Sequence, residues 1–303
     1  MTATGSLAAL ATASLVRFGH RFGRRLLLHL AVLGIMILWL VPTFGMLFNS
    51  FRTPADVSSS GWWTSIAPPW RFTLDNYEHV LNVNGLGGAF VNSLFIAIPS
   101  TVIPIAVAAF AAFAFSWMNF RGRDILFVVV VGLLVIPLQT TFVPILKLFR
   151  EVKVGDTALA GSFLSIWLAH TGYGLPFAIY LLRNYMGGLP REVFESAAID
   201  GAGPATAFFR LAVPMSVPAI AALAIFQFLF VWNDLLVALI YIGAANAPNL
   251  PLTVAVANLS NSLGGEWQYL MAAAFLSMAL PLLVFFSLQR YFVRGITGGA
   301  VKG

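Results

Sequence analysis

The sequence predicts an all-α integral membrane protein, and three observations lead to that prediction. Of the 303 residues, 59% are hydrophobic and only 9% are charged, whereas about a quarter of the residues of a soluble domain are charged. The mean hydropathy of +0.88 leaves too few polar side chains to cover a water-facing surface. The apolar residues also form charge-free runs of about 20 residues or more, the length that a helix needs to cross a bilayer. A soluble globular fold is therefore excluded.

Six such runs predict six membrane-spanning helices in a single domain, residues 26–289. The predicted spans are Leu26–Phe48, Ala89–Trp117, Ile125–Leu146, Leu159–Leu182, Val217–Ile242 and Tyr269–Leu288. The first run is too long for a removable signal peptide and lacks a small-residue cleavage site, so we expect it to remain as an anchor. Prolines lie inside spans, where a helix can bend and its neighbours can satisfy the freed carbonyl groups. Among them are Pro99, Pro104, Pro137, Pro176 and Pro281.

The positions of Lys and Arg predict the orientation. Basic residues near span ends stay in the cytoplasm, and a cytoplasmic N-terminal segment, residues 1–25, places twelve of the seventeen basic residues on that side. The C-terminal tail, residues 290–303, is then cytoplasmic as well. A second basic group consists of Lys147, Arg150 and Lys153. In this orientation it lies on the external side of the membrane, contrary to the rule, and its role stays open. The net charge of +6 is spread over span ends and forms no basic face, so it does not indicate a nucleic-acid partner.

Two external connections carry residues of distinct kinds. The connection from Asn49 to Gly88 holds a group of aromatic and proline residues within 62–70, which is typical of a folded loop at the level of the lipid headgroups. The connection from Gly243 to Trp267 is rich in Asn, Gly and Pro and contains one charged residue, Glu266. It is expected to be a loop.

The cytoplasmic connection between the fourth and fifth spans, residues 183–214, is longer than a turn requires. Pro190 suits the start of a helix, and the following residues to Asp200 are good helix formers. Gly201 and Gly203 then end that helix, and Pro204 can begin another. The segment therefore predicts a helix, a glycine turn and a second helix on the inner face. Its residues alone support docking to another protein and a simple interfacial connector equally.

The spacing in this segment resembles that of a known family. The pattern consists of Glu195-Ser-Ala197, three residues, Gly201, nine residues and Leu211-Ala-Val213-Pro214. It is similar to the EAA loop of membrane subunits of bacterial ATP-binding-cassette (ABC) importers. Ser196 in place of Ala and Leu211 in place of Ile are the departures from the family pattern. Further stretches resemble the carbohydrate branch, specifically the maltose-type second permease subunit, and the resemblance extends over roughly residues 25–303. These stretches are Leu189–Glu192, Ile199–Pro204, Trp232–Asp234 and Gln289–Gly303.

The resemblance implies a mechanism and a set of partners. In this family the loop forms a coupling helix that docks into a cleft of a cytoplasmic ATPase subunit, and the chain is not itself an enzyme. The candidate docking residues carried over are Glu195, Ala197, Asp200, Gly201 and Ala202. The implied partners are a second homologous permease, two ATPase subunits and an external sugar-binding protein, in the lipid of the bacterial cytoplasmic membrane. The loops around Trp62–Trp70 and Asn246–Glu266 would receive the binding protein.

The sequence itself indicates that any ATP must be bound elsewhere. No G-x-x-x-x-G-K-[ST] phosphate loop occurs in the chain, so ATP and Mg²⁺ are assigned to partner ATPase subunits and no cofactor to this chain. The four histidines are scattered, and the chain has no cysteine. Neither a metal site nor a catalytic constellation is therefore predicted.

Candidate residues of a solute pathway come from the polar and aromatic side chains inside spans. Tyr173, Phe226 and Trp232 could stack on a sugar ring, and Asn233 and Asp234 could line a polar path. For each of the five, packing within the helix bundle is the alternative interpretation. The resemblance leaves the sugar open among maltose, α-glucosides, trehalose, glucose and glycerol phosphate.

Three other functions remain as alternatives. An ion-coupled secondary transporter would be expected to show several ionisable groups within its spans or matched broken helices. A membrane-embedded enzyme would need a clustered acid, base or metal site, and a structural scaffold would need no transport function at all. The features of the sequence favour the permease subunit over these.

Overall fold

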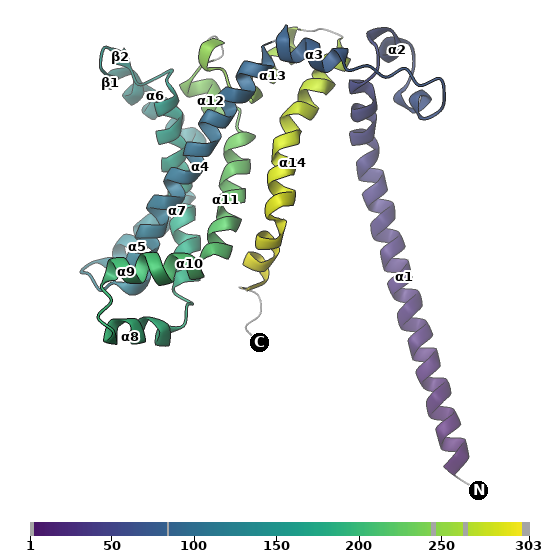
Figure 1. The fold of residues 1–303 in the computed structure, drawn as a ribbon, viewed down its shortest axis with the longest axis horizontal. Coiled ribbons are helices and arrows are strands. Elements are labelled where there is room, and N and C mark those ends of the chain that lie inside the picture. Colours follow the sequence, from purple (N-terminus) through teal and green to yellow (C-terminus); the bar gives the residue numbers. More distant parts are fainter. Residues whose placement is uncertain (1–2, 84, 244–246, 263–265, 299–303) are drawn as a thin grey trace. The chain divides into compact units, whose positions relative to one another are not determined.

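The computed structural model describes residues 3–83, 85–243, 247–262 and 266–298. The chain divides into two compact units, residues 1–74 and 75–303, and each is described by itself (Figure 1). The described residues are mostly helical, as predicted. Their strands are limited to a hairpin of two short strands, β1 (Lys153–Val154) and β2 (Thr157–Ala158).

The first unit contains one long helix and a folded segment that follows it. Its elements are α1 (Ala3–Ser50), α2 (Pro54–Ser59) and the short helix η1 (Trp62–Ile66). Arg52 is 3% exposed, and its guanidinium donates to Asn49 Oδ1 (2.9 Å), Asp56 O (2.8 Å) and Ser60 O (3.0 Å). Because one buried cation donates to several acceptors of this segment, the segment after α1 is folded, as its aromatic and proline content predicted.

The second unit contains the remaining elements. They are α3 (Asp75–Asn82), α4 (Leu86–Trp117), α5 (Arg123–Gly132), η2 (Leu133–Val135), η3 (Leu138–Thr141), α6 (Phe142–Glu151), the β1–β2 hairpin, α7 (Phe163–Met186), α8 (Arg191–Ile199), α9 (Pro204–Ala207), the π-helix η4 (Phe208–Ala212), α10 (Val213–Met215), α11 (Val217–Trp232), α12 (Leu236–Tyr241), η5 (Ala247–Asn249), α13 (Leu252–Ser262) and α14 (Trp267–Gly298).

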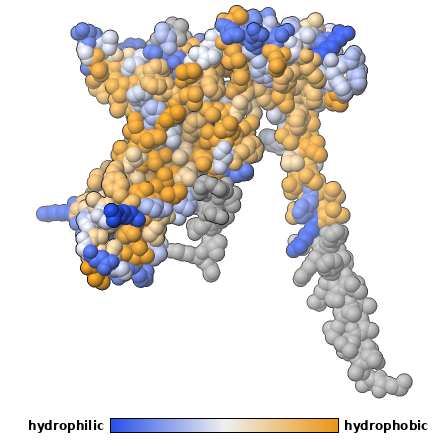
Figure 2. All heavy atoms as spheres, viewed as in Figure 1, coloured by the Kyte–Doolittle hydropathy of each residue, from blue (hydrophilic) through white to orange (hydrophobic). Residues whose placement is uncertain are grey.

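Four long helices of this unit form a bundle. Helix α4 packs against α7 and α11, and α11 packs against α14. Helices α8 and α9 lie at one end of the bundle, and α12, α13 and the β1–β2 hairpin lie at the other (Figure 1). Apolar residues cover the middle of the bundle, whereas hydrophilic residues gather at its two ends (Figure 2). This distribution is the one that a bilayer requires.

Fewer helices are long and apolar enough to span a membrane than the six predicted. Among the described residues they are Arg25–Ser50, Leu86–Trp117 and Trp267–Gln289, and two bent pairs of helices raise the number to five. Helix α7 covers most of the predicted fourth span and has 24 residues. Its polar and small residues, His170, Thr171 and Gly172 among them, lower its hydropathy. Because α7 is partly buried against α4 and α11, its surface need not be apolar throughout.

The third predicted span, Ile125–Leu146, is not a continuous helix. Residues Arg123–Val135 and Leu138–Glu151 are bent by 95° relative to each other, and Ile136 between them is extended (φ −73°, ψ 118°). Pro137 lacks an N–H group and disfavours a helical conformation at the residue before it, which explains the break. The other four prolines noted above lie within the continuous helices α4, α7 and α14.

The fifth predicted span, Val217–Ile242, is also broken. Helix α11 ends at Trp232 and α12 begins at Leu236. The Asn233 side chain donates to Leu229 O (2.8 Å), and the Asp234 carboxylate accepts from the N–H groups of Val237 (3.3 Å) and Ala238 (3.1 Å). Side chains that bond nearby backbone groups compete with the helix, so these two polar residues end one helix and begin the next.

Two boundaries toward the C-terminus differ from the sequence analysis. The connection 243–267, expected to be a loop, contains α13, whose Leu252, Ala255 and Leu259 are buried at helical spacing. Helix α14 continues to Gly298, into the predicted tail 290–303. Asn246, residues 263–265 and residues 299–303 lie outside the described part of the chain.

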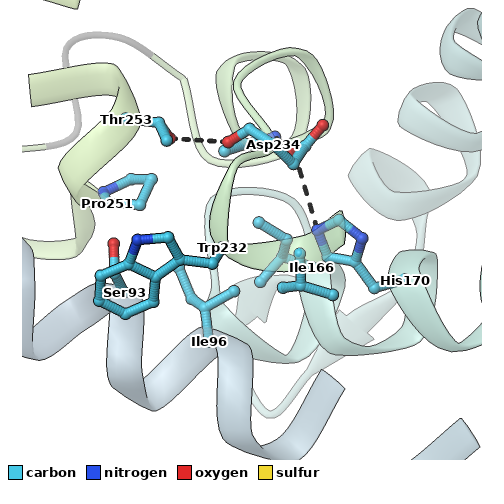
Figure 3. Close-up of a pocket in the computed structure, with 10 residues that line it drawn as sticks. Ser93, Ile96, Ile166, His170, Trp232, Asp234, Pro251 and Thr253 are labelled. Atoms are coloured by element: carbon cyan, nitrogen blue, oxygen red, sulfur yellow. Dashed lines mark hydrogen bonds and ion pairs between the residues drawn. The ribbon is translucent and has the colours of Figure 1, made fainter. Parts of the chain in front are cut away.

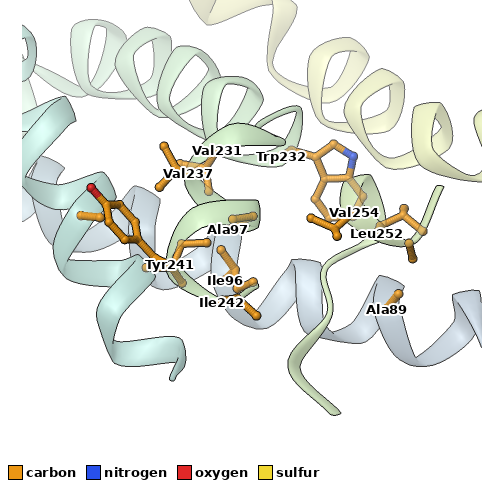
Figure 4. Close-up of a cluster of buried hydrophobic side chains, with 14 of the residues drawn as sticks. Ala89, Ile96, Ala97, Val231, Trp232, Val237, Tyr241, Ile242, Leu252 and Val254 are labelled. Atoms are coloured by element: carbon orange, nitrogen blue, oxygen red, sulfur yellow. The ribbon is translucent and has the colours of Figure 1, made fainter. Parts of the chain in front are cut away.

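Two apolar clusters hold the second unit together. One contains Trp232, Val237 and Tyr241 with residues of α4 and α13 (Figure 4). The other contains Phe113, Leu182, Met186, Phe194 and Phe208. Since Phe194 belongs to α8 and Phe208 to η4, the second cluster attaches the cytoplasmic segment predicted from the sequence to the bundle.

Candidate coupling site and solute pathway

Helix α8 forms where the sequence predicted a helix, directly after Pro190 and with Glu192 in its first turn. Phe194 is the only buried residue of this helix. Glu195 and Asp200 are exposed, and so is Ile199, whose exposed fraction is 87%. Helix α8 therefore presents carboxylates and an apolar side chain outward from the end of the bundle, while one aromatic ring holds it from within.

The turn after α8 explains why glycine is needed at position 201. Gly201 has φ +81°, a left-handed conformation that side chains with a Cβ disfavour. Its N–H donates to Ala198 O (3.1 Å), and the N–H of Ala202 donates to Ala197 O (2.9 Å). This bond pair is the common way to end a helix on a left-handed residue. A Cβ at Gly201 would have no neighbour within 4 Å, so backbone conformation, and not crowding within this chain, requires glycine.

The candidate docking residues are thus brought together on one short stretch. The turn runs from Ala197 to Ala202 through Asp200 and Gly201, and Glu195 precedes it. The carboxylates of Glu195 and Asp200 are exposed. Beyond the turn, α9 and the π-helix η4 lead to Pro214. The wide turn of the π-helix leaves room for Pro214, whose nitrogen carries no hydrogen to donate to a helical bond.

Tyr173 and Phe226 line an open groove between α7 and α11. The other lining residues are Gly174, Phe177, Leu223, Gln227 and Phe230, and the groove encloses about 230 Å³. Two of its aromatic rings, those of Phe226 and Phe230, are 45% and 48% exposed. The volume is below the roughly 300–1,000 Å³ of complete ligand pockets, so this groove is not by itself a complete pocket.

The polar atoms beside the groove are already engaged. The Tyr173 hydroxyl lies 2.8 Å from Thr141 Oγ1 and 2.7 Å from the hydroxyl of Tyr241. Gln227 Nε2 donates to Ser100 O at 3.1 Å. The groove therefore offers mainly aromatic faces, while its hydroxyl and amide groups hold the helices together.

Trp232 and Asn233 do not line this groove. Trp232 is 3% exposed, donates from Nε1 to Ser277 O (2.9 Å) on α14 and packs edge-on against Phe90. Its indole is part of the apolar core, which corresponds to the packing alternative. Asn233 is exposed, with its amide bonded to Leu229 O.

Asp234 faces a buried histidine that sequence reasoning did not pair with it. The two residues border a cavity of about 10 Å³ with Ser93, Trp232 and Thr253 (Figure 3), close to the roughly 10–15 Å³ that one water molecule needs. His170 is fully buried, and its Nε2 lies 3.8 Å from Asp234 Oδ2. No sequence signal links residues on different helices, so only the fold could reveal this pair.

No metal centre emerges from the geometry. Within the described ranges, no three His, Asp or Glu side chains are grouped closely enough to hold an ion. The arrangement combines a helical bundle with an apolar middle, an outward-facing helix–turn–helix at one end and an open aromatic groove between two helices. These features define a membrane permease subunit.

Comparison with known proteins gives the family. Residues 90–298 match the family of binding-protein-dependent transport system inner membrane components, and the chain belongs to it. It is 53% identical over 284 residues to the osmoprotective compounds uptake permease protein GgtD of Synechocystis, with 93% of each chain covered. It is 55% identical over 261 residues to the alpha-glucoside transport system permease protein AglG of Rhizobium meliloti, with 84% of this chain and 68% of that protein covered.

The fold is shared with a solved transporter. A chain of the bacterial ABC transporter that imports the acidic polysaccharide alginate superposes with a TM-score of 0.73 at 19% identity, covering 88% of this chain and 95% of that one. The chain is thus a membrane subunit of an ABC importer, and ATP hydrolysis belongs to a partner subunit. None of these findings supports the ion-coupled alternative.

Proposed function

We propose that this chain is one of two membrane subunits of an importer for a small neutral glycoside or sugar-derived osmolyte. The relatives named for alpha-glucoside and for osmoprotective compounds support this substrate class, since each is more than half identical to this chain. The single observation that supports the coupling mechanism is the exposed α8 with its left-handed turn at Gly201. Helix α7 serves as the remaining span, which brings the total to six.

Helix α8 is the docking element for the ATPase. Glu195, Ala197, Asp200, Gly201 and Ala202 contact its cleft, and Ile199 supplies an apolar side chain to it. An apolar residue that is 87% exposed at a hydrophilic end of the molecule is expected to be covered in the assembly, because its burial there is favourable.

The assembly contains a second permease, two ATPase subunits that bind ATP and Mg²⁺, and an external binding protein. The end of the bundle that bears α8 faces the cytoplasm, as do both chain termini. The segment 54–72 and the region of α13 face outward and receive the binding protein. The basic residues of the 147–153 segment then lie outside, on the end opposite α8 (Figure 1).

The solute passes along the groove between α7 and α11. Tyr173 and Phe226 present ring faces there, and the second permease closes the open side. Asn233 offers an exposed amide, whereas Trp232 and Asp234 support the wall from within the protein. The groove is lined without Lys or Arg, which favours a neutral solute over an acidic one.

The test uses the complete transporter reconstituted in liposomes with its binding protein. Gly201→Val forces a β-branched residue into the left-handed region at a cost of about 1–2 kcal/mol, so we expect ATPase co-purification and α-glucoside uptake to fall together, roughly tenfold. Gly203→Ala is the matched control. Gly203 has φ −73° and open space around its Cβ position, so this variant should assemble and transport normally.

A Gly201→Val transporter with full subunit stoichiometry and normal uptake would refute the docking role of α8. Competition with unlabelled sugars tests the proposed solute class. If an excess of an acidic sugar suppresses the uptake of labelled α-glucoside and an excess of a neutral glycoside does not, the proposed class is refuted. In the same assay, Phe226→Ala should reduce uptake about threefold to tenfold, and Phe286→Ala, whose ring is 61% exposed on α14, should not.

A further inference from the structure

Helix α8 is attached to the bundle by an aromatic contact at the end of α4. Trp117, the last residue of α4, stacks on Phe194 with ring centroids 3.8 Å apart and an angle of 18° between the rings. The Trp117 indole also donates from Nε1 to Met186 O at 3.1 Å, and Met186 ends α7. One side chain therefore joins the ends of two bundle helices to α8.

A neighbouring bond strengthens the same junction. Ser116 Oγ donates to Arg183 O at 3.1 Å, so consecutive residues of α4 each bond a carbonyl group in the last turn of α7. Residues 187–190 connect α7 to α8 directly. This four-residue connection and the Trp117–Phe194 stack therefore both tie α8 to the end of α7.

A second aromatic contact lies on the same side of α4. Phe208, which is buried in the π-helix η4, stacks on Phe110 at 4.5 Å and meets Phe113 edge-on at 5.3 Å. Phe110, Phe113 and Trp117 are spaced i, i+3 and i+7, which places them on one face of a helix. This face of α4 contacts both α8 and η4.

We propose that Trp117 is a positioning residue for energy coupling, through which displacement of α8 is transmitted to α4 and α7 together. This inference rests on the proposed docking of α8 to the ATPase. A close aromatic stack is stiff because interior rings are tightly packed, and the indole bond fixes the ring against α7. Without the stack, α8 remains bound to the ATPase but moves about the connection 187–190 without displacing α4.

The experiment measures the number of solute molecules imported per ATP hydrolysed by the reconstituted transporter. We expect Trp117→Ala to retain its ATPase subunits and its hydrolysis, while this ratio falls about fivefold or more, the usual size of a coupling effect. Trp117→Phe retains a ring for stacking and loses the indole N–H, so it should recover most of the ratio. A double-mutant cycle with Phe194→Ala should show that the two losses are not additive, because both remove the same contact.

Trp167→Ala is the matched control. Trp167 on α7 also joins α7 to α4, through a bond from Nε1 to Phe95 O at 3.0 Å and a ring contact with Phe95 at 5.3 Å, but it lies far from α8 in the sequence of α7. A general loss of packing would affect the two Ala variants alike, whereas the proposal expects the ratio to fall only in Trp117→Ala.

The outcomes separate this inference from the docking proposal. An unchanged ratio in Trp117→Ala, or an equal fall in Trp167→Ala, overturns the inference while docking stands. Loss of the ATPase subunits from Trp117→Ala also overturns it, because the residue would then be needed for assembly. If Trp117→Ala does not fold, Trp117→Leu and Phe194→Leu provide the same comparison, and a normal ratio in both overturns the inference. Docking is tested separately, and a Gly201→Val transporter that assembles and transports normally overturns it.

Discussion

At the scale of single residues, Asp234 shows how a carboxylate whose side chain is only 13% exposed can be explained by its local bonds. The carboxylate accepts two backbone N–H groups at the start of α12, and the Asp234 carbonyl accepts from Thr253 Oγ1 at 2.7 Å. These bonds join the α11–α12 break to α13. Burial of a charge is costly unless it is hydrogen-bonded, and here the bonds are present, so a structural role is sufficient to explain the residue.

We expect Asp234→Ala to lower the free energy of unfolding by about 1–2 kcal/mol, since it removes both acceptors at the start of α12. Asp234→Asn keeps one amide oxygen as an acceptor and should lose less. Thermal denaturation of the detergent-solubilised transporter, followed by size-exclusion chromatography, measures the difference.

Asp124→Asn serves as the control for that series, because Asp124 forms a surface ion pair with Arg123 (3.1 Å) and is 82% exposed in its side chain. Ion pairs on the surface contribute little to the free energy of unfolding. If Asp234→Asn abolished solute uptake while its stability matched that of the unmodified transporter, the carboxylate would act on the solute path instead.

At the scale of elements, α13 shows how an expected loop becomes a helix. Its buried side chains pack against α4 and α14, and the backbone N–H of Leu252 donates to Ser93 Oγ at 2.7 Å. The connection contains Asn, Gly and Pro, residues that favour turns. Burial of the apolar residues between those turn formers outweighs this local preference.

Truncation of a buried side chain on α13 should therefore destabilise that end of the second unit. We expect Leu252→Ala, at a residue that is 1% exposed, to cost about 2–5 kcal/mol through lost burial and the cavity that remains. Limited proteolysis of the purified transporter should then cleave within 247–262 much faster. Ser260→Ala, at an exposed position on the same helix, should be cleaved at the normal rate, and equal rates for both variants would show that α13 is not held by its apolar face.

At the scale of the whole molecule, the second unit has an apolar middle between two hydrophilic ends (Figure 2). Helix α8 lies at one end and the β1–β2 hairpin at the other (Figure 1). A chain that spans the bilayer must therefore expose these two segments on opposite sides of the membrane. Their hydrophilic character does not tell which side is cytoplasmic, and only the distribution of basic residues indicates it.

The absence of cysteine from the sequence makes this orientation directly measurable. We expect Asp156→Cys, in the exposed turn of the hairpin, to react with a membrane-impermeant maleimide in intact spheroplasts. Ser196→Cys, exposed on α8, should react only after the membrane is permeabilised. The reverse pattern would place α8 outside the cell and contradict both the orientation and the docking proposal.

The sequence by itself was enough to determine the class of the protein and the place of its most informative segment. Composition and run length indicate a membrane bundle because hydrocarbon excludes charges and unpaired backbone groups over long distances along the chain. The helix at 191–199 and the turn at Gly201 were predictable as well, because helix starts, helix ends and left-handed residues depend on neighbours within a few positions. Pro137 marked a possible bend for the same local reason.

Only the tertiary structure decided which residues share a site. Hydropathy cannot show that Asn233 and Asp234 divide a span, that α13 folds within a turn-rich connection, or that His170 faces Asp234. It also cannot pair Trp117 with Phe194, whose ring centroids are 3.8 Å apart although the two residues belong to different helices. Contacts of this kind depend on how helices pack, and packing depends on the shapes of all the surrounding side chains and not on any local pattern.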